Sequence, residues 1–194
     1  MSKLYFRYGA MNCGKTTQLL QVAHNYEEKN KKVIIIKASI DSKGKDKIVS
    51  RLGVARKVDM LLEKNEKINI ENYENISCIL VDEAQFLSEN QVTELWKISK
   101  LKNIPVICYG LKTDFKTNSF EGSKRLFELS DELEELITIC RCGKRAKFNG
   151  RIVDGKFTSS GDQVAIDGEN HVEYESLCGK CYLEKVLGIT SLDE

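Results

Sequence analysis

The strongest constraint on the fold is a glycine-bounded loop that lies between a short apolar segment and an amphipathic one. Residues 9–16 read Gly-Ala-Met-Asn-Cys-Gly-Lys-Thr, which fits the phosphate-loop pattern G-x-x-x-x-G-K-S/T. Residues 4–8 before it have the composition of a strand, and apolar residues recur with a helical period from Thr17 to about residue 30. A strand, a loop of this kind and a helix in that order predict a phosphate-binding α/β domain.

The glycines of this loop allow the backbone to wrap a phosphate with its N–H groups, and the helix that follows adds the positive end of its dipole. We expect Lys15 to reach the β- and γ-phosphates of a nucleotide, and Thr16 to bind Mg²⁺. The alternative is a chance glycine turn with an exposed lysine, which the strand and helix on either side disfavour. The residues expected to bind ATP at this loop are Gly9, Ala10, Met11, Asn12, Cys13, Gly14, Lys15 and Thr16.

A second motif is an apolar run that ends in two carboxylates. Residues 79–81 read Ile-Leu-Val and are followed by Asp82 and Glu83, as in a Walker B segment. We expect Asp82 to hold Mg²⁺, directly or through water, and Glu83 to act as the base that deprotonates an attacking hydroxyl or water. Ordinary surface carboxylates are the alternative, which the phosphate loop upstream disfavours. Ala84 and Gln85 complete the segment assigned to the nucleotide site.

The rest of the first 140 residues alternates apolar strands with amphipathic helices. Apolar runs at 33–36 and 106–109 are typical of strands covered on both faces, and 136–140 is a further candidate strand. Residues 88–91 (Ser-Glu-Asn-Gln) predict a capping box that opens a helix. Because strands that alternate with helices imply a parallel sheet, we predict an α/β fold with helices on both faces.

Two segments interrupt this alternation. Residues 42–51 are polar and lysine-rich and are expected to form a mobile loop, whereas the acidic run 131–135 is interpreted as an exposed helix face. From Cys140 onward the helical pattern stops and glycines recur. We therefore expect two domains, a nucleotide-binding core at 1–139 and a smaller unit at 140–194.

The seven cysteines fall into two groups. Cys13, Cys78 and Cys108 are scattered, and such cysteines usually behave as small buried hydrophobes. The other four form close pairs, C-x-C and C-x-x-C, which in a reducing compartment suggest a metal more than disulfides. We expect a closed, structural Zn²⁺ site that anchors both ends of segment 143–177, with unrelated free thiols as the alternative. The expected zinc ligands are Cys140, Cys142, Cys178 and Cys181.

Composition excludes several classes of protein. A chain of 194 residues with 41% hydrophobic residues is globular rather than disordered. Thirty basic residues against 29 acidic ones give a net charge of +1, which argues against a stable nucleic-acid partner. No apolar run approaches the roughly 20 residues that span a bilayer, so we expect no membrane segment. The first residues lack the apolar region of a signal peptide, and we expect a cytoplasmic protein.

At these motifs the sequence resembles the thymidine kinase family that bacteria and animal cytosol share, essentially from end to end. The resemblance includes Met11 in the phosphate loop, the Asp-Glu-Ala-Gln-Phe segment at 82–86, Phe115, the cysteine pairs and Tyr174. It implies transfer of the γ-phosphoryl group of ATP to the 5′-hydroxyl of thymidine, with Mg²⁺. It also implies a RecA-like core, a zinc-bound lasso over the nucleoside, a homotetramer, and dTTP as a feedback inhibitor.

The resemblance further implies roles for individual residues. Glu83 corresponds to the catalytic base, Gln85 lies beside the thymine pocket, and Asp41 resembles an aspartate near the magnesium and phosphates. The backbone of 164–168 is expected to grip the base. The residues expected to contact the nucleoside are Met11, Phe86, Leu111, Phe115, Val164, Ala165, Ile166, Asp167, Gly168 and Tyr174. For Phe86, Leu111 and Phe115, ordinary core packing is the alternative.

A second interpretation is a nucleic-acid-stimulated P-loop ATPase with a zinc knuckle, because residues 82–85 also resemble a helicase Walker B segment. Basic residues beside the expected zinc site support it, namely Lys144, Arg145, Lys147, Arg151 and Lys156. Helicases, however, use two RecA-like lobes, and 194 residues hold only one. We therefore favour the kinase, with a non-enzymatic nucleotide-binding module as a third interpretation.

Overall fold

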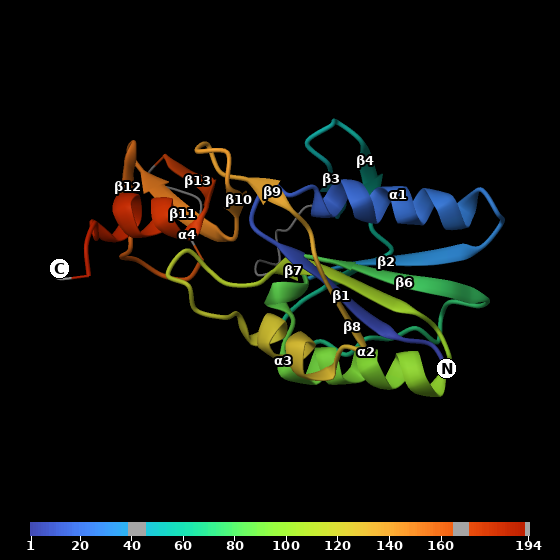
Figure 1. Cartoon of the computed structure of the whole chain (residues 1–194). Coiled ribbons are helices and arrows are strands. Elements are labelled where there is room, and N and C mark those ends of the chain that lie inside the picture. The colour runs from blue at the N-terminus through green and yellow to red at the C-terminus, as the bar shows by residue number, and fades with distance from the viewer. Residues whose placement is uncertain (39–45, 165–170, 193–194) are drawn as a thin grey trace.

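The computed structural model describes residues 1–38, 46–164 and 171–192, and within them a twisted, six-stranded parallel sheet forms the centre (Figure 1). Its strands lie in the order β5-β2-β6-β7-β1-β8, and every neighbouring pair is parallel. The strands are β1 (Leu4–Gly9), β2 (Lys32–Ala38), β5 (Met60–Leu62), β6 (Ile76–Asp82), β7 (Val106–Leu111) and β8 (Glu132–Glu135). The predicted α/β architecture with a parallel sheet is confirmed.

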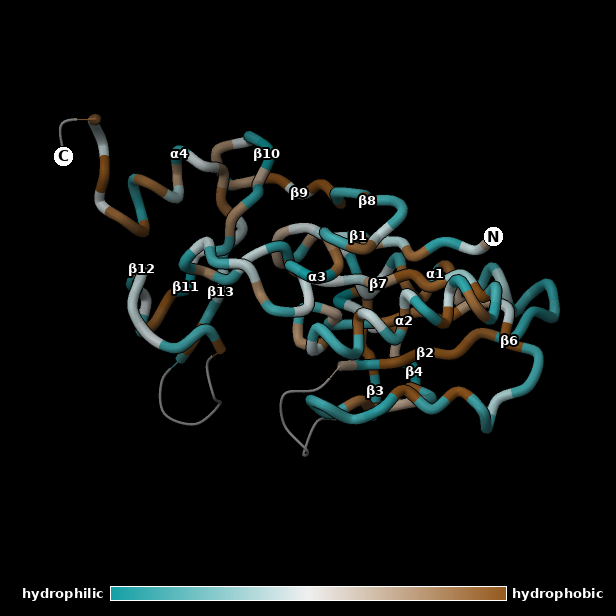
Figure 2. The backbone as a smooth tube through the Cα atoms, turned by 90° about the horizontal axis from the view of Figure 1, so that it is seen from below, coloured by the Kyte–Doolittle hydropathy of each residue, from teal (hydrophilic) through white to brown (hydrophobic). Residues whose placement is uncertain are grey.

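Helices cover both faces of this sheet, as predicted. Helix α1 (Lys15–Glu27) lies on one face, and α2 (Glu89–Leu101) and α3 (Glu121–Leu129) lie on the other (Figure 1). Successive residues of β2 point to opposite faces, so Ile35 packs with α1 while Ile34 packs with α2. In Figure 2 most of β2 has the brown colour of hydrophobic residues. None of the described helices is long and apolar enough to cross a membrane.

The start of α2 follows the local signal in the sequence. The Ser88 hydroxyl accepts a hydrogen bond from the Gln91 backbone N–H, and the Gln91 side chain accepts one from the Ser88 N–H. These reciprocal bonds satisfy two donors that would otherwise lack partners at the helix end. A short 3₁₀ turn, η1 (Ala84–Phe86), lies between β6 and this helix.

The interpretation of 131–135 as a helix face is wrong, because Glu132–Glu135 forms β8, the edge strand beside β1. Two acidic side chains of β8 form ion pairs, Glu134 with Arg7 of β1 and Glu132 with Lys3, the residue just before β1. An exposed edge strand and an exposed helix face are both polar, so composition does not separate them. Pairing with β1 decides the structure here.

Two further segments differ from the expectation. Of the candidate strand 136–140, only Thr138–Ile139 is a strand, β9, which pairs antiparallel with β10 (Arg145–Ala146) outside the main sheet. In the expected loop 42–51, Lys47–Val49 forms β3, which pairs antiparallel with β4 (Ala55–Lys57) because Ile48 is buried against the core. Residues 42–45 lie outside the described part of the chain.

A small lobe, residues 138–187 as far as they are described, lies beyond the carboxyl ends of β1 and β7 (Figure 1). Its three-stranded antiparallel sheet contains β12 (Lys156–Thr158), β11 (Phe148–Val153) and β13 (Val172–Leu177). Helix α4 (Gly179–Tyr182) and a π-helical turn, η2 (Leu183–Leu187), follow, so the helical pattern does not stop at residue 140 as expected. These two helical segments form because their Tyr182 and Val186 side chains pack into the lobe's small core.

Candidate active site

The phosphate loop connects β1 to α1, where the sequence predicts it. Strand β1 ends at Gly9 and α1 begins at Lys15, and Asn12 (φ 65°) and Gly14 (φ 83°) between them adopt left-handed backbone conformations. Only glycine fits at position 9, because an added Cβ would lie 2.6 Å from the Cys13 Sγ and 2.7 Å from the Leu136 carbonyl oxygen. The motif therefore forms a tight, wrapped loop.

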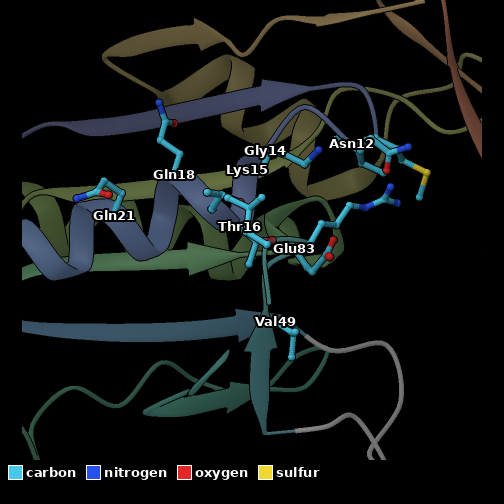
Figure 3. Close-up of a pocket in the computed structure, with 13 residues that line it drawn as sticks. Asn12, Gly14, Lys15, Thr16, Gln18, Gln21, Val49 and Glu83 are labelled. Atoms are coloured by element: carbon cyan, nitrogen blue, oxygen red, sulfur yellow. The ribbon is translucent and has the colours of Figure 1, made fainter. Parts of the chain in front are cut away.

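This loop borders a cavity with a volume of about 700 Å³. Figure 3 shows Lys15 and Thr16 at the start of α1, with Glu83 nearby and Val49 of β3 on the opposite side. The residues that line this cavity are Met11, Asn12, Gly14, Lys15, Thr16, Thr17, Gln18, Gln21, Val49, Arg51, Leu52, Glu83 and Leu111. Sequence reasoning missed the contributions of α1 beyond Thr16 and of the β3–β4 hairpin, since neither carries a motif.

The Lys15 side chain folds back over its own loop. Its Nζ donates a hydrogen bond to the Ala10 carbonyl oxygen at 2.9 Å and lies 3.5 Å from the Cys13 Sγ. The ammonium group therefore stays beside the loop rather than extending into solvent. From this position the Lys15 ammonium can give up its hydrogen bond to the neutral Ala10 carbonyl and donate to a phosphate oxygen instead. The new bond is stronger because both of its partners are charged.

Asp82 and Thr16 meet below the phosphate loop. The Thr16 hydroxyl lies 3.3 Å from Asp82 Oδ2, and Asp82 is only 4% exposed. Burial, with the charge of Glu83 adding to it, raises the pKa of Asp82 to about 6. A buried carboxylate beside a hydroxyl offers the oxygen donors that Mg²⁺ prefers, so the pair fits such an ion.

Glu83 is held at the edge of the cavity beside the phosphate loop by a neighbouring glutamine. Its backbone adopts a left-handed conformation (φ 53°), which is uncommon for a residue with a side chain. Gln85 Nε2 donates to Glu83 Oε2 at 2.6 Å, and Gln85 Oε1 accepts the Leu111 N–H at 3.1 Å. Gln85 therefore fixes the Glu83 carboxylate to the end of β7.

A smaller cavity of about 230 Å³ adjoins this larger one. It brings together six of the residues expected to contact the nucleoside: Met11, Phe86, Leu111, Phe115, Val164 and Tyr174. It also contains Asp114, Phe120, Asn149, Gln163 and Val172, which the sequence analysis did not identify. Of these five residues, the sequence could have suggested only Asp114, because it directly precedes Phe115. Ala165, Ile166, Asp167, Gly168 and Asp41 lie outside the described residues.

The two cavities meet at Met11 and Leu111, which line both. One side of this junction has the phosphate loop and Glu83, and the other has aromatic and aliphatic walls. A phosphorylated ligand in the first cavity and a flat, partly apolar ligand in the second would therefore face each other. Such an arrangement suits transfer of a group between two bound molecules.

Arg151 joins the walls of the smaller cavity. Its guanidinium carbon lies 3.7 Å from the centre of the Phe115 ring, and its Nε donates to the Tyr174 hydroxyl at 3.0 Å. It also donates to the carbonyl oxygens of Asp162, at 2.7 Å, and Gln163, at 3.2 Å. Arg151 is 4% exposed, so it does not belong to the basic surface cluster that the sequence suggested.

Several residues assigned to the nucleotide site support it without lining either cavity. Gly9, Ala10 and Cys13 form the body of the loop, and Asp82, Ala84 and Gln85 are buried beneath it.

Asp114, which lines the smaller cavity, is held by hydrogen bonds to both of its carboxylate oxygens. Its Oδ1 accepts hydrogen bonds from the backbone N–H groups of Lys116 and Asn118, and its Oδ2 accepts one from Gln163 Nε2 at 3.0 Å.

The four predicted zinc ligands come together in the small lobe. The sulfur atoms of Cys140, Cys142, Cys178 and Cys181 all lie within 4.8 Å of one another. A tetrahedral ion with Zn–S bonds of ~2.3 Å places sulfur atoms ~3.8 Å apart, so the cluster fits zinc. None of the seven cysteines forms a disulfide, so all four thiols of the cluster are available to a metal.

Two of the four cysteines favour the thiolate, the form in which cysteine binds zinc, whereas hydrogen bonds with the neighbouring thiols, that of Cys142 first, raise the pKa of Cys181 to about 12. Burial opposes ionisation of Cys140, but hydrogen bonds from the backbone at Cys142 and Cys178 outweigh it and lower the pKa of its thiol to about 7. A backbone hydrogen bond from Cys181 lowers the pKa of the Cys178 thiol in the same way. A closed site of four thiolates serves folding rather than catalysis.

Comparison with known proteins agrees with this geometry. Residues 2–182 match the family model described as thymidine kinase. The thymidine kinase of Chromobacterium violaceum is 44% identical over 184 residues, which cover 94% of this chain and 98% of the relative. The thymidine kinases of Pasteurella multocida and Haemophilus influenzae are 42% and 43% identical, over 96% and 95% of this chain and 99% and 98% of the relatives. The range that the family model matches includes both the phosphate loop and the four cysteines. With relatives this similar over nearly its whole length, the chain belongs to the thymidine kinase family.

Proposed function

We propose that this protein transfers the γ-phosphoryl group of ATP to the 5′-hydroxyl of thymidine and so produces dTMP. The observation that carries this proposal is the junction of the two cavities at Met11 and Leu111. ATP occupies the cavity beside the phosphate loop, and the thymine base occupies the smaller cavity with its aromatic walls. The two reacting groups then meet beside Glu83.

In this proposal the phosphate loop holds the donor. Backbone N–H groups of the loop and the start of α1 bind the phosphates, and Lys15 leaves the Ala10 carbonyl to bind their oxygens. Thr16 and Asp82 hold the Mg²⁺ that, when bound, neutralises charge on the phosphates. Ala84 and Gln85 support Asp82 and Glu83 from the buried side.

Glu83 is the catalytic base. Its carboxylate accepts the proton of the 5′-hydroxyl as that oxygen attacks the γ-phosphorus. The hydrogen bond from Gln85 keeps the carboxylate facing the junction of the cavities, and the buried Gln85–Leu111 bond keeps Gln85 in place. Since the base is fixed before the substrate binds, little reorganisation is needed when the reaction begins.

The small lobe recognises the nucleoside. Its Tyr174 encloses the thymine ring together with Phe86 and Phe115 of the core. The backbone of 164–168 pairs with the polar edge of the base. Zinc at the four cysteines anchors both ends of segment 143–177 and lowers the entropy that this segment loses when it orders over the base. We retain 1–139 and 140–194 as the core and lasso units. The homotetramer, dTTP inhibition and a cytoplasmic location stay predictions.

The basic cluster supports the ATPase interpretation less than the sequence suggested. Arg151 is buried against Phe115, and Arg145 pairs with Glu135 at 2.8 Å. Fewer cations are therefore available to contact nucleic acid than the sequence suggested.

The direct test is a panel of labelled nucleosides with ATP and Mg²⁺, in which monophosphate products are separated and counted. We expect labelled dTMP from thymidine and no purine monophosphate, because the smaller cavity excludes a purine by size. A parallel reaction contains DNA in place of nucleoside. Phosphate release with DNA, together with no dTMP from thymidine, would contradict the proposal.

A further inference from the structure

One residue of the phosphate loop, Met11, is held by two side chains of the small lobe. Asn149 Oδ1 in β11 accepts a hydrogen bond from the Met11 N–H at 2.7 Å, and the Ser176 hydroxyl in β13 donates to the Met11 carbonyl oxygen. Asn149 and Ser176 are direct partners in the pairing of β11 with β13. One cross-strand pair of the lobe therefore binds both backbone polar groups of a single loop residue.

These contacts are shielded from water and are aimed by further bonds. Asn149 is 3% exposed and Ser176 is 7% exposed. Asn149 Nδ2 also donates a hydrogen bond to the Thr113 carbonyl oxygen at 3.3 Å, and this bond orients the side-chain amide so that its Oδ1 faces Met11. A buried hydrogen bond with fixed partners holds its geometry more firmly than one that competes with water.

The contact with Ser176 sets the direction of a neighbouring N–H group. Because a peptide group is planar and trans, the Asn12 N–H points opposite to the Met11 carbonyl. Asn12 lines the larger cavity and has a left-handed backbone conformation. Loops of this kind bind phosphate through successive, correctly aimed N–H groups. The Met11 N–H itself is already used by Asn149.

We propose that Asn149 and Ser176 are positioning residues for the phosphate loop, through which the small lobe sets the loop's affinity for nucleotide. This inference rests on the proposed function only in taking the larger cavity as the nucleotide site. A disturbance of β11 or β13 then reaches the phosphates through Met11. The lobe thus contributes to both substrate sites.

Ser176 is the better probe of this role. It lines neither cavity, whereas Asn149 lines the smaller one. Ser176→Ala removes the donor to Met11, and Ser176→Thr keeps a hydroxyl there. Ser99→Ala is the matched control, because Ser99 in α2 is also buried and its hydroxyl also donates to a backbone carbonyl, that of Trp96 at 2.7 Å.

The experiment measures ADP binding to the full-length protein by calorimetry without thymidine, together with Tm and zinc content. We expect Ser176→Ala to raise the ADP Kd about tenfold, the change that ~1.4 kcal/mol produces. Ser176→Thr should recover most of that affinity, and Ser99→Ala should leave it unchanged. In turnover, Ser176→Ala should raise the KM for ATP more than it lowers kcat.

Two results would overturn the inference. The first is that Ser176→Ala and Ser99→Ala bind ADP with the same Kd. The second is that both variants lose affinity for ADP only in proportion to the fall in their Tm. A wild-type protein that binds ADP but makes no dTMP would contradict the proposed function alone. In that case weaker ADP binding by Ser176→Ala still supports the positioning role.

Discussion

The main sheet and the small lobe are stabilised in different ways. The sheet buries long aliphatic strands between helices, and Ile35 and Leu80 at its centre are fully buried. The strands of the small lobe are only partly buried, and its described residues form a core cluster of six buried side chains, of which Cys140 and Cys178 are two. Units with so little apolar core usually need a metal or disulfides. The sheet can therefore fold by hydrophobic burial, whereas the lobe depends on its thiols.

The two regions also divide the proposed chemistry. Lys15 and Glu83, just beyond the carboxyl ends of β1 and β6, line the cavity assigned to the phosphates. In the lobe, Tyr174 lines the cavity assigned to the nucleoside, and Arg151 holds the walls of that cavity. Changes in the core should therefore lower kcat, and changes in the lobe should mainly raise KM. The predictions below test this division.

The largest effect is expected for Glu83→Gln, which keeps the shape of the site but removes the proton acceptor. Steady-state assays should show a loss of kcat of roughly 10²–10⁴-fold, the usual contribution of a general base. ADP affinity, measured in parallel by calorimetry, should change little. Near-normal turnover by this variant would exclude Glu83 as the base.

Lys15→Ala should follow, with a loss of roughly 10²–10³-fold in kcat, because it removes one charged donor to the transferring phosphoryl group. Unlike the Glu83 variant, it should also raise the KM for ATP, since the same ammonium binds the ground-state phosphates. Initial rates over a range of ATP concentrations measure both effects. Undiminished thymidine phosphorylation would show that the phosphate-loop assignment is wrong.

Cys178→Ser should break the lobe while leaving the sheet folded. We expect loss of bound zinc, faster proteolysis within 143–177, and a rise in the thymidine KM of roughly 10–100-fold, as is typical when a metal site is disrupted. Because the lobe also holds Met11, the KM for ATP should rise by a smaller factor.

The matched control for this change is Cys78→Ser, since Cys78 is buried in β6 and its thiol contacts the Ile79 carbonyl oxygen. This variant should retain its zinc. Zinc content is measured by mass spectrometry, and cleavage is compared with and without thymidine. Equal cleavage of both variants and the wild type in all samples would mean that this segment does not close over the substrate.

The smallest of these effects is expected for Arg151→Lys, which keeps the charge but loses the planar group that stacks on Phe115 and binds Tyr174. The thymidine KM should rise about fivefold, corresponding to ~1 kcal/mol, with little change in kcat. Arg125→Lys on α3 is the control, because Arg125 pairs with Glu128 near the surface. An equal KM for the two variants would contradict a role for Arg151 in holding the cavity walls.

The sequence alone was sufficient where structure depends on near neighbours. The phosphate loop requires glycine at positions 9 and 14, and the capping box is complete within residues 88–91. Apolar runs such as those in β2 and β7 predict buried strands because little else can cover their side chains. The spacing of the cysteines likewise predicted a cluster that the structure assembles.

Only the tertiary structure decided features that depend on distant partners. The acidic run 131–135 becomes a strand because it pairs with β1, and Arg151 is buried because Phe115 and Tyr174 are brought beside it. The contact of Asn149 with Met11 joins residues 138 positions apart. Local patterns limit which conformations a segment can adopt, but the choice among exposed, polar alternatives is made by contacts that form only when the whole chain has folded.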